Sequence, residues 1–298
     1  MQQEPDELFE LAGSAPEGAP ILHHLEGFID AGGAGRLLAE HLLQDYEHET
    51  VARFNADRLI DYRSRRPTMI FENGHWASYD APELALHLIR DASERPFLLL
   101  TGPEPDHEWE LFTTAVLKLA DQLKAGPAIS FLGIPAGVPH TRPLGVIGHG
   151  TRDGLVTGSQ QLPSRLELPG SAGALLELRF GEAGRDALGF AVQVPHYLAQ
   201  TSYPAASLAL LGSLTEFTGL DLPGVDLRVA SDRTNESIQR QVADSTEITE
   251  LVQALEQQYD DAASQDQSTL LADGQAMPTA DELAAQFERF LADQPPEG

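Results

Sequence analysis

The sequence predicts an α/β protein with a three-layer α/β/α arrangement, a mainly parallel sheet with helices on both faces, and a small C-terminal helical hairpin domain. Three observations indicate this class. Short apolar runs, typical of strands buried on both faces, alternate with segments of helical periodicity. Few tight-turn dipeptides separate the apolar runs, which favours crossover connections over hairpins. Beyond about residue 230, strand patterns stop and helical periodicity continues.

The first half of the chain follows this alternation. Leu38, Leu42 and Tyr46 recur at helical spacing after a glycine-rich turn, and Asn73-Gly74 is a favoured tight-turn dipeptide. Pro82 suits the first turn of a helix. The predicted elements are an irregular arm with one helical turn (1–20), a strand (21–26), a glycine-rich turn (27–35), a helix (36–46), a strand (49–54), a hairpin (68–76), a helix (82–94), a strand (96–101) and a helix (106–123).

The second half continues with apolar strands and then only helices. Pro204 begins one helix, Ser231 begins a long one with an apolar stripe that extends to Tyr259, and Thr279 with Glu282 forms a capping box for the last. The predicted elements are strands (128–133, 144–148), a long loop (150–170), a helix (171–182), a strand (189–194), a helix (204–218) and the two terminal helices. We therefore expect an α/β domain over residues 1–230 and an acidic helical hairpin domain over residues 231–298.

Composition excludes several classes of protein. The 298 residues contain no cysteine, which removes disulfides, iron–sulfur clusters, thiolate zinc sites and cysteine nucleophiles. The 46 acidic residues against 19 basic ones give a net charge of −27, which argues against nucleic acid and anionic membranes as partners. The sequence has neither an apolar run long enough to cross a membrane nor a readable secretory signal, so a cytoplasmic location is expected.

The acidity itself has three explanations that the sequence leaves open. Codon bias toward Ala, Arg and Gly accounts for the scarcity of lysine, adaptation to salt accounts for the excess of acids, and a basic partner is the third. The excess is not uniform, because residues 231–298 hold 15 acidic residues against three basic ones.

Three loops at strand ends are candidate sites. The first is the glycine-rich turn with Asp30, Gly32 and Gly33, which resembles part of a dinucleotide-binding turn but has Leu38 at the third glycine position. Such a turn either presents backbone N–H groups to a phosphate or simply permits close strand-to-helix packing. Asp30 would repel an anion there, although it could orient a hydroxyl.

The second candidate loop, residues 133–150, contains His140, Thr141 and Arg142 among prolines. Arg142 could clamp a carboxylate or phosphate, and His140 could transfer protons; alternatively Arg142 pairs with one of the chain's own acids. The third, residues 195–204, holds His196, Tyr197 and Tyr203, which form either a ligand wall or interface, or ring packing at a helix start.

We expect no metal site, catalytic residue or cofactor. The ten histidines show no HExxH motif, and His23 and His24 are adjacent on a strand, so they face opposite sides. No G-x-S-x-G nucleophile motif and no P-loop are present in the sequence.

The residues of the first turn resemble a family signature. Residues 27–32, GFIDAG, are similar to the G-[WF]-x-D-A-G motif of the PAC2 (proteasome assembly chaperone 2) family. HTRP at 140–143, and PHYLAQTSYPAA from 195 leading into an LLGSL helix, look like later blocks of that family, in the same order over residues 20–230. The acidic helical tail resembles the actinobacterial branch.

The resemblance implies a nucleoside-phosphorylase-like topology, self-assembly as a trimer, and interaction with proteasome subunits. Some relatives carry ATP-grasp or ligase names, but this chain has only Lys118 and Lys124 for a nucleotide-binding lysine pair. Eukaryotic relatives dock through a hydrophobic–Tyr–X tail, whereas this sequence ends in QPPEG. The leading hypothesis is a non-enzymatic, homo-oligomeric assembly factor or scaffold. The alternative is an enzyme or binder for a small anionic ligand at the carboxyl edge of the sheet.

Overall fold

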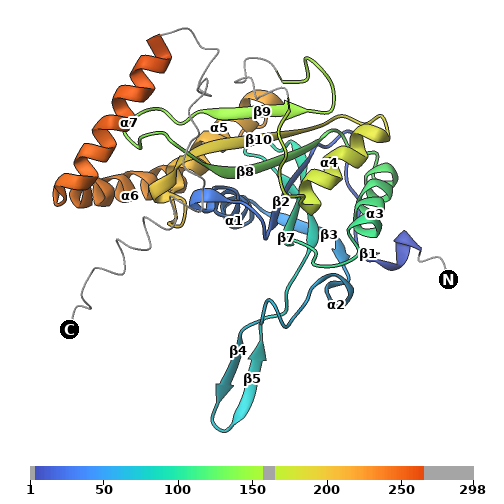
Figure 1. Cartoon of the computed structure of the whole chain (residues 1–298). Helices are drawn as coiled ribbons and strands as arrows, with labels where there is room; N and C mark the ends of the chain where they lie inside the picture. The colour runs from blue at the N-terminus through green and yellow to red at the C-terminus, as the bar shows by residue number, and fades with distance from the viewer. Residues whose placement is uncertain (1–3, 157–164, 265–298) are drawn as a thin grey trace.

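An eight-stranded sheet forms the centre of the protein in the computed structural model, which describes residues 4–156 and 165–264 (Figure 1). Its strand order is β1-β3-β6-β7-β2-β8-β10-β9. The strands are β1 (Phe9–Leu11), β2 (Ile21–Glu26), β3 (His48–Phe54), β6 (Ala85–Arg90), β7 (Pro96–Pro103), β8 (Ala128–Ala136), β9 (Val146–Gly150) and β10 (Ala187–Pro195).

The sheet is mainly parallel, as the sequence predicts. The four central strands β7, β2, β8 and β10 pair in parallel, while β6 and β9 flank them in the antiparallel direction. Strand β3 pairs antiparallel with β6 and therefore points the same way as the central four. The carboxyl ends of β2, β8 and β10 consequently meet at one edge of the sheet.

Helices cover both faces and complete the three layers. Helices α1 (Ala34–Asp45), α5 (Pro204–Thr218) and α6 (Val225–Ala243) contribute buried residues to one core, and α3 (Trp109–Gln122) and α4 (Ala172–Glu182) contribute to the other. Successive strand residues alternate between the two cores: Phe97 and Leu99 face the first, whereas Leu98 and Leu100 face the second. Helix α7 (Thr246–Ser264) follows α6 (Figure 1).

A separate two-stranded hairpin projects from this body (Figure 1). It consists of β4 (Met69–Glu72) and β5 (His75–Tyr79), joined at Asn73-Gly74, where both residues have positive φ. This confirms the hairpin that the Asn-Gly dipeptide predicts. A single turn, α2 (Ala56–Leu59), precedes the hairpin, and its N-cap Asn55 accepts a hydrogen bond from the Arg58 backbone.

Residues 82–94 are not a helix, contrary to the sequence-based prediction. They contain β6, in which Leu86 and Leu88 face one core and His87 and Ile89 point to the opposite face. Five of its six residues are buried, so the polar alternation that marks a strand is missing. Leucine and alanine favour a helix, but pairing with β3 and β7 overrides that preference.

The two ends of the chain also differ from expectation. The N-terminal arm contains a 3₁₀ turn (Pro5–Glu7) and β1, with Leu8 fully buried beside them, instead of a helical turn at residues 7–12. The helix expected from Ser231 begins at Val225, and the stripe that extends to Tyr259 is divided between α6 and α7. The helix expected from Thr279 lies outside the described residues, and the domain division at residues 230/231 stays a prediction.

Within the described ranges, no helix is long and apolar enough to cross a membrane, and no three His, Asp or Glu side chains gather as metal ligands.

A fully buried histidine makes the fold sensitive to acid. His23 on β2 is 2 % exposed, and its Nε2 has no hydrogen-bond partner among the described residues. Burial lowers the pKa of His23 from 6.5 to about 4, against a smaller opposing effect of the Glu177 carboxylate. Between pH 6.5 and about 4, therefore, His23 is protonated in the unfolded chain but neutral in the folded chain.

We predict that His23→Leu flattens the pH dependence of stability. The wild-type contribution from neutral His23 is present above pH 6.5 and is lost as the pH falls toward about 4. Urea unfolding at several pH values between 7 and 5 should give a smaller loss of unfolding free energy for His23→Leu than for the exposed control His107→Leu. Equal slopes for the two variants would contradict this assignment.

Candidate functional site

The three candidate loops, which the sequence analysis placed at separate strand ends, lie together at the carboxyl edge of β2, β8 and β10. The turn at residues 27–33 follows β2, the loop at residues 137–145 follows β8, and the turn at residues 196–203 follows β10. Because these strands are parallel neighbours in the sheet, the loops that leave them are also neighbours.

The Asp30 carboxylate joins the first loop to the second strand. Its Oδ1 accepts hydrogen bonds from the backbone N–H groups of Gly35 (2.8 Å) and Gly133 (2.9 Å), and its Oδ2 accepts one from Arg36 (3.0 Å). The first and third donors belong to the first turn of α1 and the second belongs to β8. Asp30 thus satisfies two of the unpaired N–H groups at the start of α1 and occupies the place where an anion would bind.

Glycines permit this close approach. A Cβ on Gly133 would lie 2.1 Å from the Ala31 carbonyl oxygen, so only glycine fits on β8 beneath the turn. Gly32 has φ of 70°, and Gly33, the N-cap of α1, has φ of 58°, both in the left-handed region. The small residues of the motif therefore serve strand-to-helix packing, which is the second of the two interpretations of this turn.

Backbone hydrogen bonds join the first loop to the third. The Gly32 N–H donates to the Ala199 carbonyl (2.8 Å), and the Tyr203 N–H donates to the Gly32 carbonyl (2.8 Å). Tyr203 is 1 % exposed, and burial raises its pKa to about 12. Tyr203 is therefore a core residue at the start of α5, not part of an exposed wall.

Tyr197 connects the third loop to the second. The His140 N–H donates to Tyr197 Oη (2.9 Å), which leaves the hydroxyl proton to be donated to His140 Nδ1 (2.8 Å). Burial lowers the pKa of His140 and raises that of Tyr197 to about 12, so both side chains are neutral at pH 7. His196 packs its ring against Tyr197, with centroids 5.4 Å apart, and burial lowers its pKa as well.

Arg142 and Thr141 hold helix α7 against the second loop. Arg142 Nε and Nη2 donate to Asp260 Oδ1 (2.8 Å) and Oδ2 (2.7 Å), a bidentate pair that lowers the pKa of Asp260. Arg142 Nη1 and Thr141 Oγ1 both donate to Glu256 Oε1, and Tyr259 Oη donates to the Pro143 carbonyl (3.1 Å). Arg142 therefore pairs with the chain's own acids, the simpler of the two interpretations that the sequence left open.

Three residues of α7, Glu256, Tyr259 and Asp260, complete this contact and were not expected at the site. Glu256 and Asp260 were not among the candidate residues, and Tyr259 was expected only as part of an apolar stripe. A signal existed, because residues 256, 259 and 260 are three and four positions apart and so share one side of a helix. Glu104 was also missed: it is 7 % exposed, and its Oε1 accepts a hydrogen bond from the Ala172 N–H (2.6 Å) at the start of α4.

The sequence pattern of the PAC2 family matches residues 24–242, a span that contains all three loops. The chain belongs to the PAC2 family. No curated protein is detectably similar in sequence.

Several solved bacterial structures are similar to this chain. A Mycobacterium tuberculosis protein of unknown function is 43 % identical, with 87 % of this chain and 90 % of that chain covered and a TM-score of 0.82. A Corynebacterium glutamicum protein of unknown function is 37 % identical, with 87 % and 99 % covered and a TM-score of 0.83. A Mycobacterium tuberculosis proteasome-assembly chaperone homologue is 24 % identical, with 78 % and 99 % covered and a TM-score of 0.72.

These structures place the chain among actinobacterial PAC2 proteins, which confirms the predicted family branch and α/β fold. The further comparison with nucleoside phosphorylases stays a prediction. In a PAC2 protein of this kind, the GFIDAG motif has a structural explanation, because its aspartate and glycines hold the β2–α1 turn against β8.

We predict that Asp30→Ala destabilises the fold strongly. It leaves three backbone N–H groups without their acceptor, at a cost of about 1–3 kcal/mol for each group that stays buried. Thermal or urea unfolding should show a loss of at least ~3 kcal/mol, whereas the exposed control Asp153→Ala should stay within ~0.5 kcal/mol of wild type. A loss below 1 kcal/mol for Asp30→Ala would contradict the structural role.

We predict that Arg142→Ala loosens α7 without unfolding the sheet. Hydrogen exchange of amides in residues 246–261 should rise about fivefold, a modest increase because the ion pair is exposed to solvent. Arg152→Ala is a matched control, because Arg152 forms the same bidentate pair with Asp186, away from α7. If both variants exchange equally in this segment, Arg142 does not hold the helix.

Proposed function

We propose that this PAC2-family protein is a homo-oligomeric assembly factor or protein-interaction scaffold of the cytoplasm, without enzymatic activity and with a proteasome-related role. The observation that carries the proposal is the β4–β5 hairpin, which projects from the body (Figure 1). Its strands expose large apolar side chains to solvent.

The hairpin has the composition of a contact surface. All nine strand residues are exposed, and Phe71 and Trp76, at 57 % and 63 %, pack edge-to-face on each other. The large apolar residues exposed on it are Met69, Ile70, Phe71, Trp76 and Tyr79. An isolated two-stranded hairpin is only marginally stable in water, and exposed apolar patches of this kind mark interaction sites.

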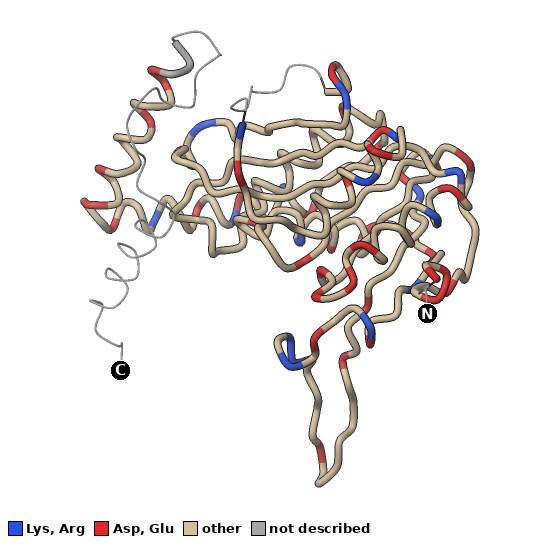
Figure 2. The backbone as a smooth tube through the Cα atoms, turned by 45° about the vertical axis from the view of Figure 1, so that its right-hand side comes forward, with Lys and Arg blue, Asp and Glu red and all other residues tan. Residues whose placement is uncertain are grey.

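Charge favours a second copy of the chain as the partner of the hairpin. Two copies with a net charge of −27 each repel one another over most of their surface. The hairpin strands carry one charged residue, Glu72, and few charged positions lie along its arms (Figure 2). Contact through the hairpin therefore meets less electrostatic repulsion than contact through acidic parts of the surface. A trimer, which the family resemblance implies, is the assembly we propose.

The proteasome-related part of the proposal rests on relatives. One structurally similar protein from Mycobacterium tuberculosis is described as a proteasome-assembly chaperone homologue. Membership of the same family extends that role to this chain as a proposal, with the identity of the bound subunit open.

The alternative, a site for a small anion, has less support from the geometry. Arg142, which would bind the anion, already donates to Asp260 and Glu256. Asp30, which would orient a hydroxyl group of the ligand, already accepts three backbone hydrogen bonds. Both groups would have to leave their partners before they could bind a ligand.

We predict that the hairpin controls the mass of the protein in solution. Light scattering coupled to size-exclusion chromatography should give a multiple of the 32.3 kDa protomer for wild type and a smaller assembly for Phe71→Ser/Trp76→Ser. Leu166→Ser/Leu168→Ser removes two equally exposed leucines elsewhere and should leave the mass unchanged. A monomeric wild type, or a hairpin variant of wild-type mass, would contradict the proposal.

A quantitative pull-down from the organism's own cells tests the partner. Proteasome subunits should be enriched with wild-type protein. If no protein partner is enriched, the assembly-factor role should be abandoned, even where the protein proves oligomeric.

A further inference from the structure

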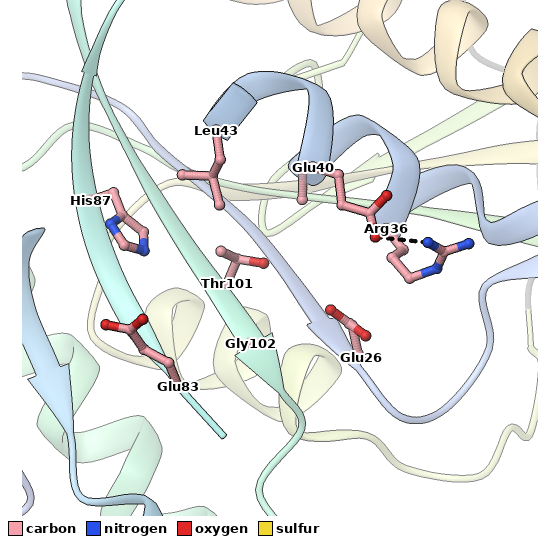
Figure 3. A pocket seen from close by; sticks show the side chains of 9 residues that line it. Glu26, Arg36, Glu40, Leu43, Glu83, His87, Thr101 and Gly102 are labelled. Carbon is pink, nitrogen blue, oxygen red and sulfur yellow. Dashed lines mark hydrogen bonds and ion pairs between the residues drawn. The ribbon is translucent and has the colours of Figure 1, made fainter. Parts of the chain in front are cut away.

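A cavity of about 160 Å³ lies beside α1, on the face of the sheet that α1 covers only in part (Figure 3). It is separate from the His140–Arg142 contact and plays no part in the proposed function. Four elements line it: the end of β2, the first half of β6 together with Glu83 two residues before that strand, the end of β7, and one side of α1. The lining residues are Glu26, Arg36, Ala39, Glu40, Leu43, Glu83, His87, Thr101 and Gly102.

The strand topology explains why these side chains share one cavity. Ala85, two residues before His87, pairs with Thr101 across the β6–β7 ladder, so His87 and Thr101 point to the same face. Glu26 is two residues beyond His24 on β2 and points to the same face as well. From α1, Arg36, Ala39, Glu40 and Leu43 recur at spacings of three and four and form one helix side.

Negative charge exceeds positive charge in this cavity. Arg36 Nη1 donates to Glu40 Oε1 (2.7 Å), so these two residues neutralise each other. Glu83 accepts one hydrogen bond from Arg53, which is outside the lining. The Glu26 carboxylate has no hydrogen-bond or ion-pair partner within the described ranges, although it points into the cavity (Figure 3). One full carboxylate and part of another are therefore available to a cation.

The floor of the cavity holds a buried polar group with capacity to spare. His87 is only 7 % exposed, and its ring points into the cavity (Figure 3). Its Nδ1 lies 3.4 Å from Thr50 Oγ1, while no partner is found for Nε2 among the described residues. Burial lowers the pKa of His87, so the ring is neutral at pH 7 and does not repel a cation. The neighbouring Thr101 hydroxyl is likewise without a partner in the described chain.

The size and the remaining walls select the kind of cation. The volume corresponds to about five water molecules, which suits a compact organic molecule better than a bare ion. Ala39 and Leu43 provide an apolar wall for a hydrocarbon stem, while Glu26 and Glu83 suit an ammonium or guanidinium head. No three His, Asp or Glu side chains in the described ranges are placed to ligate a metal ion.

We propose that this cavity binds a small organic cation, a primary amine or guanidinium compound, whose charged head pairs with Glu26 and Glu83 while its stem lies against Ala39 and Leu43. Thr101 and His87 at the floor accept or donate the remaining hydrogen bonds of the ligand. The site lies at the carboxyl ends of β2 and β7, the edge at which α/β proteins place their ligands.

Isothermal titration calorimetry of the full-length protein tests this site. The probes are putrescine and agmatine in buffer with physiological salt, with 1,4-butanediol and succinate as uncharged and anionic comparators of similar length. At least one of the two amines should bind saturably at one site per chain, and neither comparator should bind. No saturable heat from either amine at millimolar concentration overturns the proposal, as does equal binding of butanediol.

Variants separate the cavity from the general negative field of the protein. Glu26→Gln and Glu83→Gln should each weaken amine binding at least tenfold, while Glu216→Gln, an exposed control on α5, should not change it. Because Glu26 and Glu83 are exposed at the rim, both variants should retain the wild-type melting temperature. Equal weakening by all three variants would mean that amines gather only as counterions, and displacement of the amine by equimolar Mg²⁺ would mean a metal site; either result overturns the proposal.

Discussion

The Asp30 carboxylate is the constraint on which the rest of the strand-end region depends. It accepts three backbone N–H groups, two from the start of α1 and one from β8, and so determines how the β2–α1 turn sits on the sheet. With the turn in this position, Gly32 forms backbone hydrogen bonds with residues 199 and 203. These bonds fix the third loop beside the first. A carboxylate supplied by the chain itself does what a bound phosphate does at other glycine-rich turns.

Side chains of helix α7 bind the second loop. The bidentate Arg142–Asp260 pair and the Glu256 contacts bring part of the acidic C-terminal region against the α/β body. Some of the excess negative charge of residues 231–298 is therefore paired with a cation of the chain itself. The polar groups at the ends of β8 and β10 contact neighbouring loops and α7, whereas the hairpin exposes five large apolar side chains.

Much of the fold could be predicted from the sequence, because the local sequence signals agreed with the structure that each segment adopts in the folded protein. Wholly apolar runs marked β7 and β8, Asn73-Gly74 marked the hairpin, and Pro204 marked the start of α5. The prediction failed at β6, where burial on both faces removed the alternation that distinguishes a strand from a helix. The break between α6 and α7 was also missed, although its signal was present: Val242 and Ile248 are six residues apart, whereas a continuous apolar stripe repeats every three or four.

The candidate site was predictable in its location but not in its partners. Asp30, His140 and Tyr197 were each expected at the end of a strand, and the parallel pairing of β2, β8 and β10 is what brings these ends to one edge. The sequence contains 46 acidic residues and does not indicate which of them pairs with Arg142. The cavity at Glu26 and His87 was equally hidden, since it depends on β6 being a strand that the sequence analysis read as a helix.

The central claim is that this PAC2 protein keeps its strand-end polar groups for internal contacts and meets its own copies through the β4–β5 hairpin. Hydrogen exchange of the wild-type protein, followed peptide by peptide over a wide range of protein concentrations, tests it most directly. The account predicts that amides of residues 69–79 become protected as the concentration rises, while the loops at residues 27–33 and 196–203 are protected at every concentration. Hairpin amides that exchange at the same fast rate at all concentrations would contradict it.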